Sequence, residues 1–315
     1  MLKVGAQSCG FYRDDDPVGS LEYIKARGFQ SVDFNIDLKM PVGRLVKQKT
    51  GPFESFFSKS IEEILDFYRP LKDAVEQTGV TVDQMHAPFP SYFPGYDELN
   101  EYLFEGVVKS MAVCQLIGCP AIVVHPTHRS TFEKEWDTNL ANYRRLIPYA
   151  KQYGVKVCLE NIFNNRGGRM VEGRLSNAAD ACRLVDLLNE EAGEECFGFC
   201  FDIGHANLTN RNVKEFVKTL GHRLTILHIH DNNGRDDLHM VPYSYLATPN
   251  LHSIDWQGFV EGLKEIGYKG VLGFEICRIW LAYPKAVHDL VLNLVAGIGK
   301  YWAECIDDPN WPAQK

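Results

Sequence analysis

The chain has 315 residues, of which 45% are hydrophobic and 23% are charged, and its formal net charge is −8. These values are normal for a soluble globular protein, and a core of this size needs no disulfides to hold it. The acidic balance argues against nucleic acid as a partner, because proteins that bind polyanions usually carry a basic stripe.

Neither a secretory signal nor a membrane span is predicted. The first residues lack the charged-then-apolar pattern of a signal peptide, and no apolar run approaches the ~20 residues that a membrane helix needs. The nine cysteines are odd in number and form no CxxC pair. A reducing cytoplasm is therefore the expected location.

Short apolar segments alternate with longer amphipathic segments along the chain. The apolar segments predict strands at 2–8, 31–36, 80–86, 121–125, 156–161, 198–203, 224–231 and 271–276. The amphipathic segments predict helices near 18–28, 58–78, 97–117, 135–153, 176–192, 213–221, 255–266 and 284–303. Alternating strand–helix units form parallel sheets, and eight such units without a linker predict one closed (β/α)8 TIM barrel domain over residues 1–315.

Several predicted loops after strands are long, and barrel enzymes build their pockets from such loops. These long loops cover residues 37–57, 87–96, 162–175 and 232–254. The first of them is a candidate lid or subunit contact. Asp97, Ser176 and Asp255 are the predicted helix N-caps.

Six consecutive predicted strands end in a side chain that can bind a metal or move a proton. These residues are His86, His125, Glu160, Asp202, His228 with His230, and Glu275. Strand side chains alternate between faces, so Cys158, Cys200 and Gly273 share the faces of the three acidic residues. Such small neighbours would leave room near the barrel axis.

A glutamate, an aspartate, a histidine and a second glutamate form a mixed oxygen and nitrogen ligand set. Such a set suits Mn²⁺, Mg²⁺, Co²⁺ or Zn²⁺, and a cation would relieve the repulsion between buried carboxylates. Any one of these residues alone more often hydrogen-bonds a loop than ligates a metal. Their joint occurrence on neighbouring strands indicates a divalent metal site.

These residues and their neighbours resemble the xylose isomerase-like barrel superfamily, the sugar phosphate isomerase/epimerase group that also includes endonuclease IV. The resemblance covers about residues 2–280 and rests on HAP at 86–88, HP at 125–126, LEN at 159–161, FDIGH at 201–205, HIHDNNGRDDLH at 228–239, IDW at 254–256 and GFE at 273–275. In this order the motifs are specific for the superfamily but not for a substrate.

The resemblance implies a role for each matching residue. It implies Glu160, Asp202, His228 and Glu275 as metal ligands. His228 is preferred to His230 because it stands three residues before Asp231, as in the family's pattern. The resemblance further implies that His205, His86 and His125 face substrate or a further zinc. It also matches Asp237 and His239 to the Asp-x-His pair that completes a three-metal site.

The leading functional hypothesis is a divalent-metal-dependent isomerase or epimerase of a sugar, a sugar phosphate or another hydroxy-carbonyl compound. Glu160 and Glu275 would transfer the proton through a metal-stabilised enediolate. The expected substrate-binding residues are His86, His125, His205, His230, Arg235 and Arg278. The expected binding partner is a small sugar-like substrate, and a homodimer is a possible assembly.

Two alternatives remain open. A dehydratase or lyase acting on a polyol or cyclic acid would use the same enolate chemistry and expel water. An endonuclease IV-like phosphodiesterase would need three metals and a basic surface. The segment 241–256 stands where the family has a Gly-rich turn, and this difference leaves the substrate class open.

Overall fold

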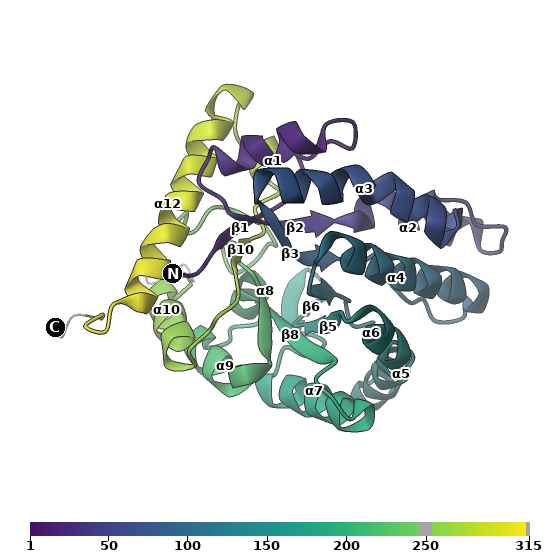
Figure 1. Cartoon of the computed structure of the whole chain (residues 1–315). Helices are drawn as coiled ribbons and strands as arrows, with labels where there is room; N and C mark the ends of the chain where they lie inside the picture. The colour runs from purple at the N-terminus through teal and green to yellow at the C-terminus, as the bar shows by residue number, and fades with distance from the viewer. Residues whose placement is uncertain (246–253, 313–315) are drawn as a thin grey trace.

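The computed structural model describes residues 1–245 and 254–312 (Figure 1). The predicted long loop 232–254 therefore lies partly outside the described residues. Eight parallel strands form the main sheet, in the order β10-β1-β2-β3-β4-β5-β8-β9. Their bounds are β1 Val4–Gln7, β2 Ser31–Asn35, β3 Thr81–His86, β4 Ala121–Val123, β5 Lys156–Glu160, β8 Phe197–Asp202, β9 Leu224–His228 and β10 Leu272–Phe274.

The sheet closes on itself between β9 and β10. The amide of Ile229 donates to the carbonyl of Gly273 at 2.8 Å, and the amide of Glu275 donates to the carbonyl of Ile229 at 3.0 Å. The residue that follows β9 therefore joins the two ends of the sheet. This closure confirms the predicted (β/α)8 barrel.

Helices surround the strands on the outside of the barrel (Figure 1). Their bounds are α1 Pro17–Lys25, α3 Ile61–Thr78, α4 Asp97–Ile117, α5 Phe132–Arg144, α6 Ile147–Tyr153, α7 Ala178–Ala192, α9 Val213–Leu220, α10 Trp256–Glu265 and α12 His288–Asp307. The predicted helix 135–153 is wrong in one respect, because it is two helices with Pro148 at the start of the second. Helices α3 and α4 end at Gly79 and Gly118 in the left-handed conformation, as expected.

The long loops contain secondary structure that hydrophobic periodicity did not reveal. The segment 37–57 holds most of a 3-10 turn, Ile36–Lys39, and the helix α2, Val42–Gln48. The segment 162–175 folds into an antiparallel hairpin of β6, Phe163–Arg166, and β7, Arg169–Glu172. Two short helices, α8 Ile203–Leu208 and α11 Ile279–Ala282, follow β8 and β10. These helices and strands are too short for hydrophobic periodicity to reveal them in the sequence.

One of the three predicted N-caps is confirmed. The Asp255 side chain accepts from the amide of Gly258 at the start of α10. Asp97 is instead the first residue of α4, whose N-cap is Tyr96. Asn177 caps α7 in place of Ser176, because the hydroxyl of Ser176 donates backwards to the carbonyl of Gly173.

A small apolar layer fills the barrel below the strand-end residues. It consists of Ala121, Val123, Cys158, Cys200 and Ile226. The two cysteines therefore lie inside the barrel, on the face predicted from strand alternation. Gly273, which precedes Glu275 by two residues, also faces the barrel interior as predicted. A Cβ atom at this position would stand 3.0 Å from the side-chain oxygen of the buried Gln84.

Within the described residues, no helix combines the length and the apolar character that a membrane crossing requires.

The docking of α12 on the barrel yields a stability prediction with a matched control. A Cβ on Gly299 would stand 2.6 Å from Val4 and 2.9 Å from Phe274, whereas a Cβ on Gly297 meets nothing within 4 Å. We expect Gly299→Ala to destabilise the fold by about 1–3 kcal/mol through overpacking. Gly297→Ala should stabilise it by up to about 1 kcal/mol through helix propensity. Thermal unfolding measures both, and shifts of the same sign would contradict this packing.

Candidate active site

The strand-end carboxylates and imidazoles come together at the C-terminal mouth of the barrel. Glu160, Asp202 and His228 expose 1% or less of their surface, and Glu275 exposes 8%. Two carboxylates and an imidazole from β8, β9 and the end of β10 place their donor atoms within 4.8 Å of one another. These are Asp202, His228 and Glu275.

His228 links this group to Glu160 on β5. Its Nδ1 atom lies 3.4 Å from Oε1 of Glu160 and 3.4 Å from Oε2 of Glu275. Ligands that each stand about 2.0–2.2 Å from one cation are separated by distances of this size. The four side chains predicted as ligands therefore converge on a common region.

The chemistry of these atoms fits a divalent cation. Both ring nitrogens of His228 and the Oε2 atom of Glu160 are buried without a hydrogen-bond partner among the described residues. Buried polar atoms are rarely left without a partner, since each costs free energy. Oxygen and imidazole donors also suit the metals that the sequence predicts.

Two polar side chains deeper in the barrel hold the ligand set. The amide nitrogen of Gln7 donates to Oε1 of Glu275 at 2.9 Å, which leaves Oε2 facing His228. Asp33 on β2 lies 3.5 Å from Nε2 of His228 and is 2% exposed. A carboxylate behind a ligating imidazole fixes its tautomer and ring orientation.

The buried carboxylates and imidazoles of the cluster shift one another's pKa values strongly. Burial disfavours the charged form of Glu160, but His125 and His228 outweigh this and hold its pKa well below the usual range. Burial likewise opposes protonation of His228, yet neighbouring acidic groups, among them Glu275 and Glu160, raise its pKa well above the ordinary value. A bound cation would displace that proton.

His230 joins a second group of donor atoms beside the first. Its Nε2 atom lies 3.1 Å from both oxygens of Asp202, and its ring stacks on His239 with centroids 4.0 Å apart. Asp237 accepts from Nε2 of His239 at 3.0 Å and stands 3.7 Å from Nε2 of His205. The structure thus brings the predicted Asp-x-His pair to the barrel mouth.

His86 and His125 form a third group with Glu160. The Nε2 atom of His125 lies 2.7 Å from Oε2 of Glu160, although the angles are not those of a hydrogen bond. His86 packs against His125 with ring centroids 4.8 Å apart. Three of the predicted substrate-binding histidines, these two and His205, therefore surround the glutamate.

A cavity of about 430 Å³ lies beside the second and third groups. His125, His205 and Asp237 form part of its wall, and most of the remainder is aromatic or apolar. Its volume is in the range of small-molecule sites. The aromatic residues that line it are Phe89, Tyr92, Phe93 and Phe163.

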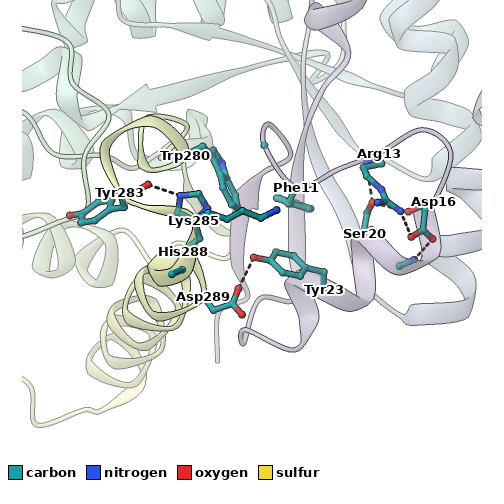
Figure 2. Close-up of a pocket in the computed structure, with 13 residues that line it drawn as sticks. Phe11, Arg13, Asp16, Ser20, Tyr23, Trp280, Tyr283, Lys285, His288 and Asp289 are labelled. Carbon is teal, nitrogen blue, oxygen red and sulfur yellow. Dashed lines mark hydrogen bonds and ion pairs between the residues drawn. The ribbon is translucent and has the colours of Figure 1, made fainter.

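A larger cavity of about 1030 Å³ lies between the loop after β1 and the start of α12 (Figure 2). Its polar groups are largely paired with one another, since Arg13 bonds Asp16 and Tyr23 bonds Asp289. None of the strand-end donors lines it. We therefore place the active site in the smaller cavity.

The predicted substrate-binding arginines do not reach this cavity. Arg235 and Arg278 are exposed, and neither lines it. Arg174, which sequence reasoning did not single out, lines it instead. Asp33 was also missed, although a carboxylate inside the apolar segment 31–36 was a usable signal.

Comparison with known proteins identifies related sequences and structures. Residues 21–290 match the family model described as xylose isomerase-like TIM barrel. An uncharacterized protein of Methanocaldococcus jannaschii is 32% identical over 203 residues, which are 61% of this chain and 63% of that protein. This chain thus spans less than two thirds of that relative. The inosose isomerase of Bacillus subtilis is 23% identical over 227 residues, covering 67% of this chain and 75% of the enzyme.

Solved structures share the fold over nearly the whole chain. A D-tagatose 3-epimerase-like protein superposes with a TM-score of 0.67 and 24% identity, covering 97% of this chain and 98% of that protein. The IOLI protein, solved with a binding zinc atom, superposes with a TM-score of 0.64 and 16% identity over 97% of this chain and 98% of its own.

The contact between Asp33 and His228 generates a prediction about metal binding. Asp33→Asn keeps the side-chain shape but removes the charge behind the imidazole, so we expect affinity for Mn²⁺ or Zn²⁺ to fall by about 10–100-fold. Titration calorimetry measures this affinity directly. Asp83→Asn on β3 is the matched control, because Asp83 pairs with Lys3 outside the cluster. Equal affinities in the two variants would contradict a role for Asp33.

Proposed function

The chain belongs to the xylose isomerase-like TIM barrel family, and we propose that it is a divalent-metal-dependent isomerase or epimerase of a sugar or related hydroxy-carbonyl compound. The observation that carries this proposal is the convergence of two buried carboxylates from different strands. Glu160 and Glu275 approach the same nitrogen of His228, so both face one small volume at the barrel mouth.

The two glutamates can move a proton between two positions of one substrate. One carboxylate removes the proton from the carbon next to the carbonyl, which leaves an enediolate. The other carboxyl group donates a proton back, either to the opposite face of the same carbon or to the neighbouring carbon. The first outcome is epimerisation and the second is isomerisation.

Glu160, Asp202, His228 and Glu275 would hold the cation. When bound, a divalent ion supplies Lewis-acid polarisation of the substrate oxygens, which acidifies the neighbouring C–H bond. Asp202 is held for this role on both sides, since its amide donates to Oδ1 of Asn161 at 2.9 Å and its Oδ1 accepts from the amide of His205. The structurally similar IOLI protein was solved with a binding zinc atom, which supports a divalent metal in this fold.

The histidines around the glutamates orient the substrate. The Nδ1 atom of His205 contacts the carbonyl of Asn161 at 2.9 Å, so its Nε2 atom faces the cavity beside Asp237. His86 ends β3 and His125 follows β4, so both approach Glu160 from the side of β5 that lies away from β8. Aromatic faces such as Phe163, whose ring lies 5.0 Å from that of His205, give a sugar ring an apolar surface to pack on.

The names of relatives support sugar-like substrates. An inosose isomerase and a D-tagatose 3-epimerase-like protein are both named for carbonyl compounds that are rich in hydroxyl groups. A panel of ketoses that includes D-tagatose and inosose is therefore the first choice for assay. Analysis of the product separates an isomerase from a dehydratase, because only the latter releases water.

Phosphodiester cleavage is the second candidate, since three neighbouring groups of donor atoms could hold more than one metal. The net charge of −8 makes a nucleic-acid partner less favourable. Nicking of a duplex with an abasic site, together with a count of bound metals, tests this candidate.

The proton-transfer proposal predicts the behaviour of two glutamine variants. Glu160→Gln and Glu275→Gln should each lower kcat by at least about 10²–10⁴-fold, because each removes a proton-transferring group. Incorporation of solvent deuterium at the reacting carbon, followed by NMR, measures the exchange step separately from turnover.

Glu261→Gln is the matched control, since Glu261 pairs with Lys214 on the outside of the barrel. Its kcat should equal that of the unaltered protein. Full activity in both strand-end variants, with deuterium exchange intact, would reject the assignment of these glutamates.

A further inference from the structure

Arg174 lies at the base of the β6–β7 hairpin, where the chain passes close to the end of β5. The amide of Ile162 donates to the carbonyl of Arg174 at 2.8 Å. A Cβ on Gly173 would stand 2.2 Å from the carbonyl oxygen of Ile162, so only glycine permits this approach. The buried hydroxyl of Ser176 also bonds both the amide and the carbonyl of Gly173. The backbone that carries Arg174 is therefore held on two sides.

The guanidinium of Arg174 has no partner within the described part of the chain. It forms no ion pair and donates no side-chain hydrogen bond to residues 1–245 or 254–312. Its Nε atom is buried and unsatisfied. Burial lowers the pKa of Arg174 from its ordinary value, and Glu135 only partly offsets this effect. An unpaired, partly buried cation is costly unless a ligand compensates it.

Glu135 is a nearby carboxylate, and two other groups already contact one of its two oxygens. Its Oε2 atom lies 2.7 Å from Nδ1 of His128 and accepts from the amide of Arg129 at 2.9 Å. Glu172, next but one to Arg174 in the chain, pairs with Arg211. Glu135 and Glu172 line a second cavity of about 160 Å³ together with Arg174, but neither carboxylate forms an ion pair with its guanidinium.

Arg174 shares a cavity with two of the histidines that flank the proposed catalytic Glu160. The cavity of about 430 Å³ is lined by Arg174, His125, His205 and Asp237, together with the aromatic wall. A molecule held by the histidines therefore has a free guanidinium within the same enclosure. Arginine presents several N–H donors in a fixed planar fork, which matches the oxygens of a phosphate or carboxylate.

We propose that Arg174 binds an anionic group of the substrate, a phosphate ester or a carboxylate, and that the substrate is an anionic sugar rather than a neutral one. The statement that the ligand is a sugar rests on the proposed function, whereas the anion site at Arg174 does not. A neutral sugar could accept hydrogen bonds from the guanidinium but would leave its charge uncompensated, whereas an oxyanion satisfies both the donors and the charge. Arg174 then selects the substrate, while the glutamates carry out the proton transfer.

The anion site is tested first without turnover. Inorganic phosphate is added to metal-loaded protein, and its effect on the thermal midpoint is measured for the unaltered chain and for Arg174→Gln, Arg174→Lys and Arg169→Gln. We expect phosphate to raise the midpoint by a few degrees in the unaltered chain and in Arg169→Gln. The rise should be lost in Arg174→Gln and partly kept in Arg174→Lys. Arg169 is the matched control because it is exposed on the same hairpin.

Substrate selection is tested second, with pairs that differ only in charge. The value of kcat/KM is measured for a ketose, its terminal phosphate and the corresponding keto-uronate. In Arg174→Gln the preference for the anionic member should fall by roughly 100-fold, mainly through KM, because kcat/KM for the neutral ketose should change much less. The phosphate and uronate arms show which anion the site prefers.

The two tests separate the failure of this inference from the failure of the proposed function. A phosphate effect that persists in Arg174→Gln places the anion elsewhere, for instance on the metal, and overturns the inference. Equal turnover of neutral and anionic ketoses by the unaltered protein also overturns it. A phosphate effect that requires Arg174, in a protein that turns over none of the sugars, supports the anion site and rejects the proposed function.

Discussion

The structure depends on a concentration of buried charge at one end of the barrel. Glu160, Asp202 and Glu275 are carried by different strands, yet they share a volume so small that His228 lies within ion-pair distance of two of them. Carboxylates at this spacing repel one another strongly in a medium of low dielectric constant. A divalent cation, as we propose, would satisfy all of them together, and the surrounding side chains hold them in the positions that such a cation would need.

The barrel supplies that arrangement through its closure and its interior packing. Parallel strands place their C-terminal ends at one level, and small residues such as Cys158 and Cys200 occupy the layer beneath the acidic side chains. Asp33 and Gln7 then support the ligands from the N-terminal strands, which the closed sheet brings beside β9 and β10. The ligand set is thus held by groups far away in sequence. This rigidity is what a proton transfer between two fixed carboxylates requires.

The candidate site could be predicted from sequence where a residue ends a strand. Glu160 and Glu275 follow apolar segments, so their height in the barrel follows from chain order alone. Arg174 lies on a hairpin whose strands are four residues long, and no periodicity marks so short an element. Arg235 and Arg278 illustrate the same difficulty, because a loop position does not reveal whether its side chain faces a cavity or solvent. Loop residues near a motif are therefore weaker candidates than strand-end residues.

The sequence by itself determined the fold class, the order of the strand–helix units and the set of strand-end side chains, because alternation and amphipathic periodicity are local properties of the chain. It also indicated that the mouth of the barrel carries the chemistry. Only the tertiary structure decided that Asp33 stands behind His228 and that the Arg174 guanidinium lacks a carboxylate partner among the described residues. These facts depend on contacts between distant segments, and burial and pairing are properties of the assembled fold rather than of any one segment.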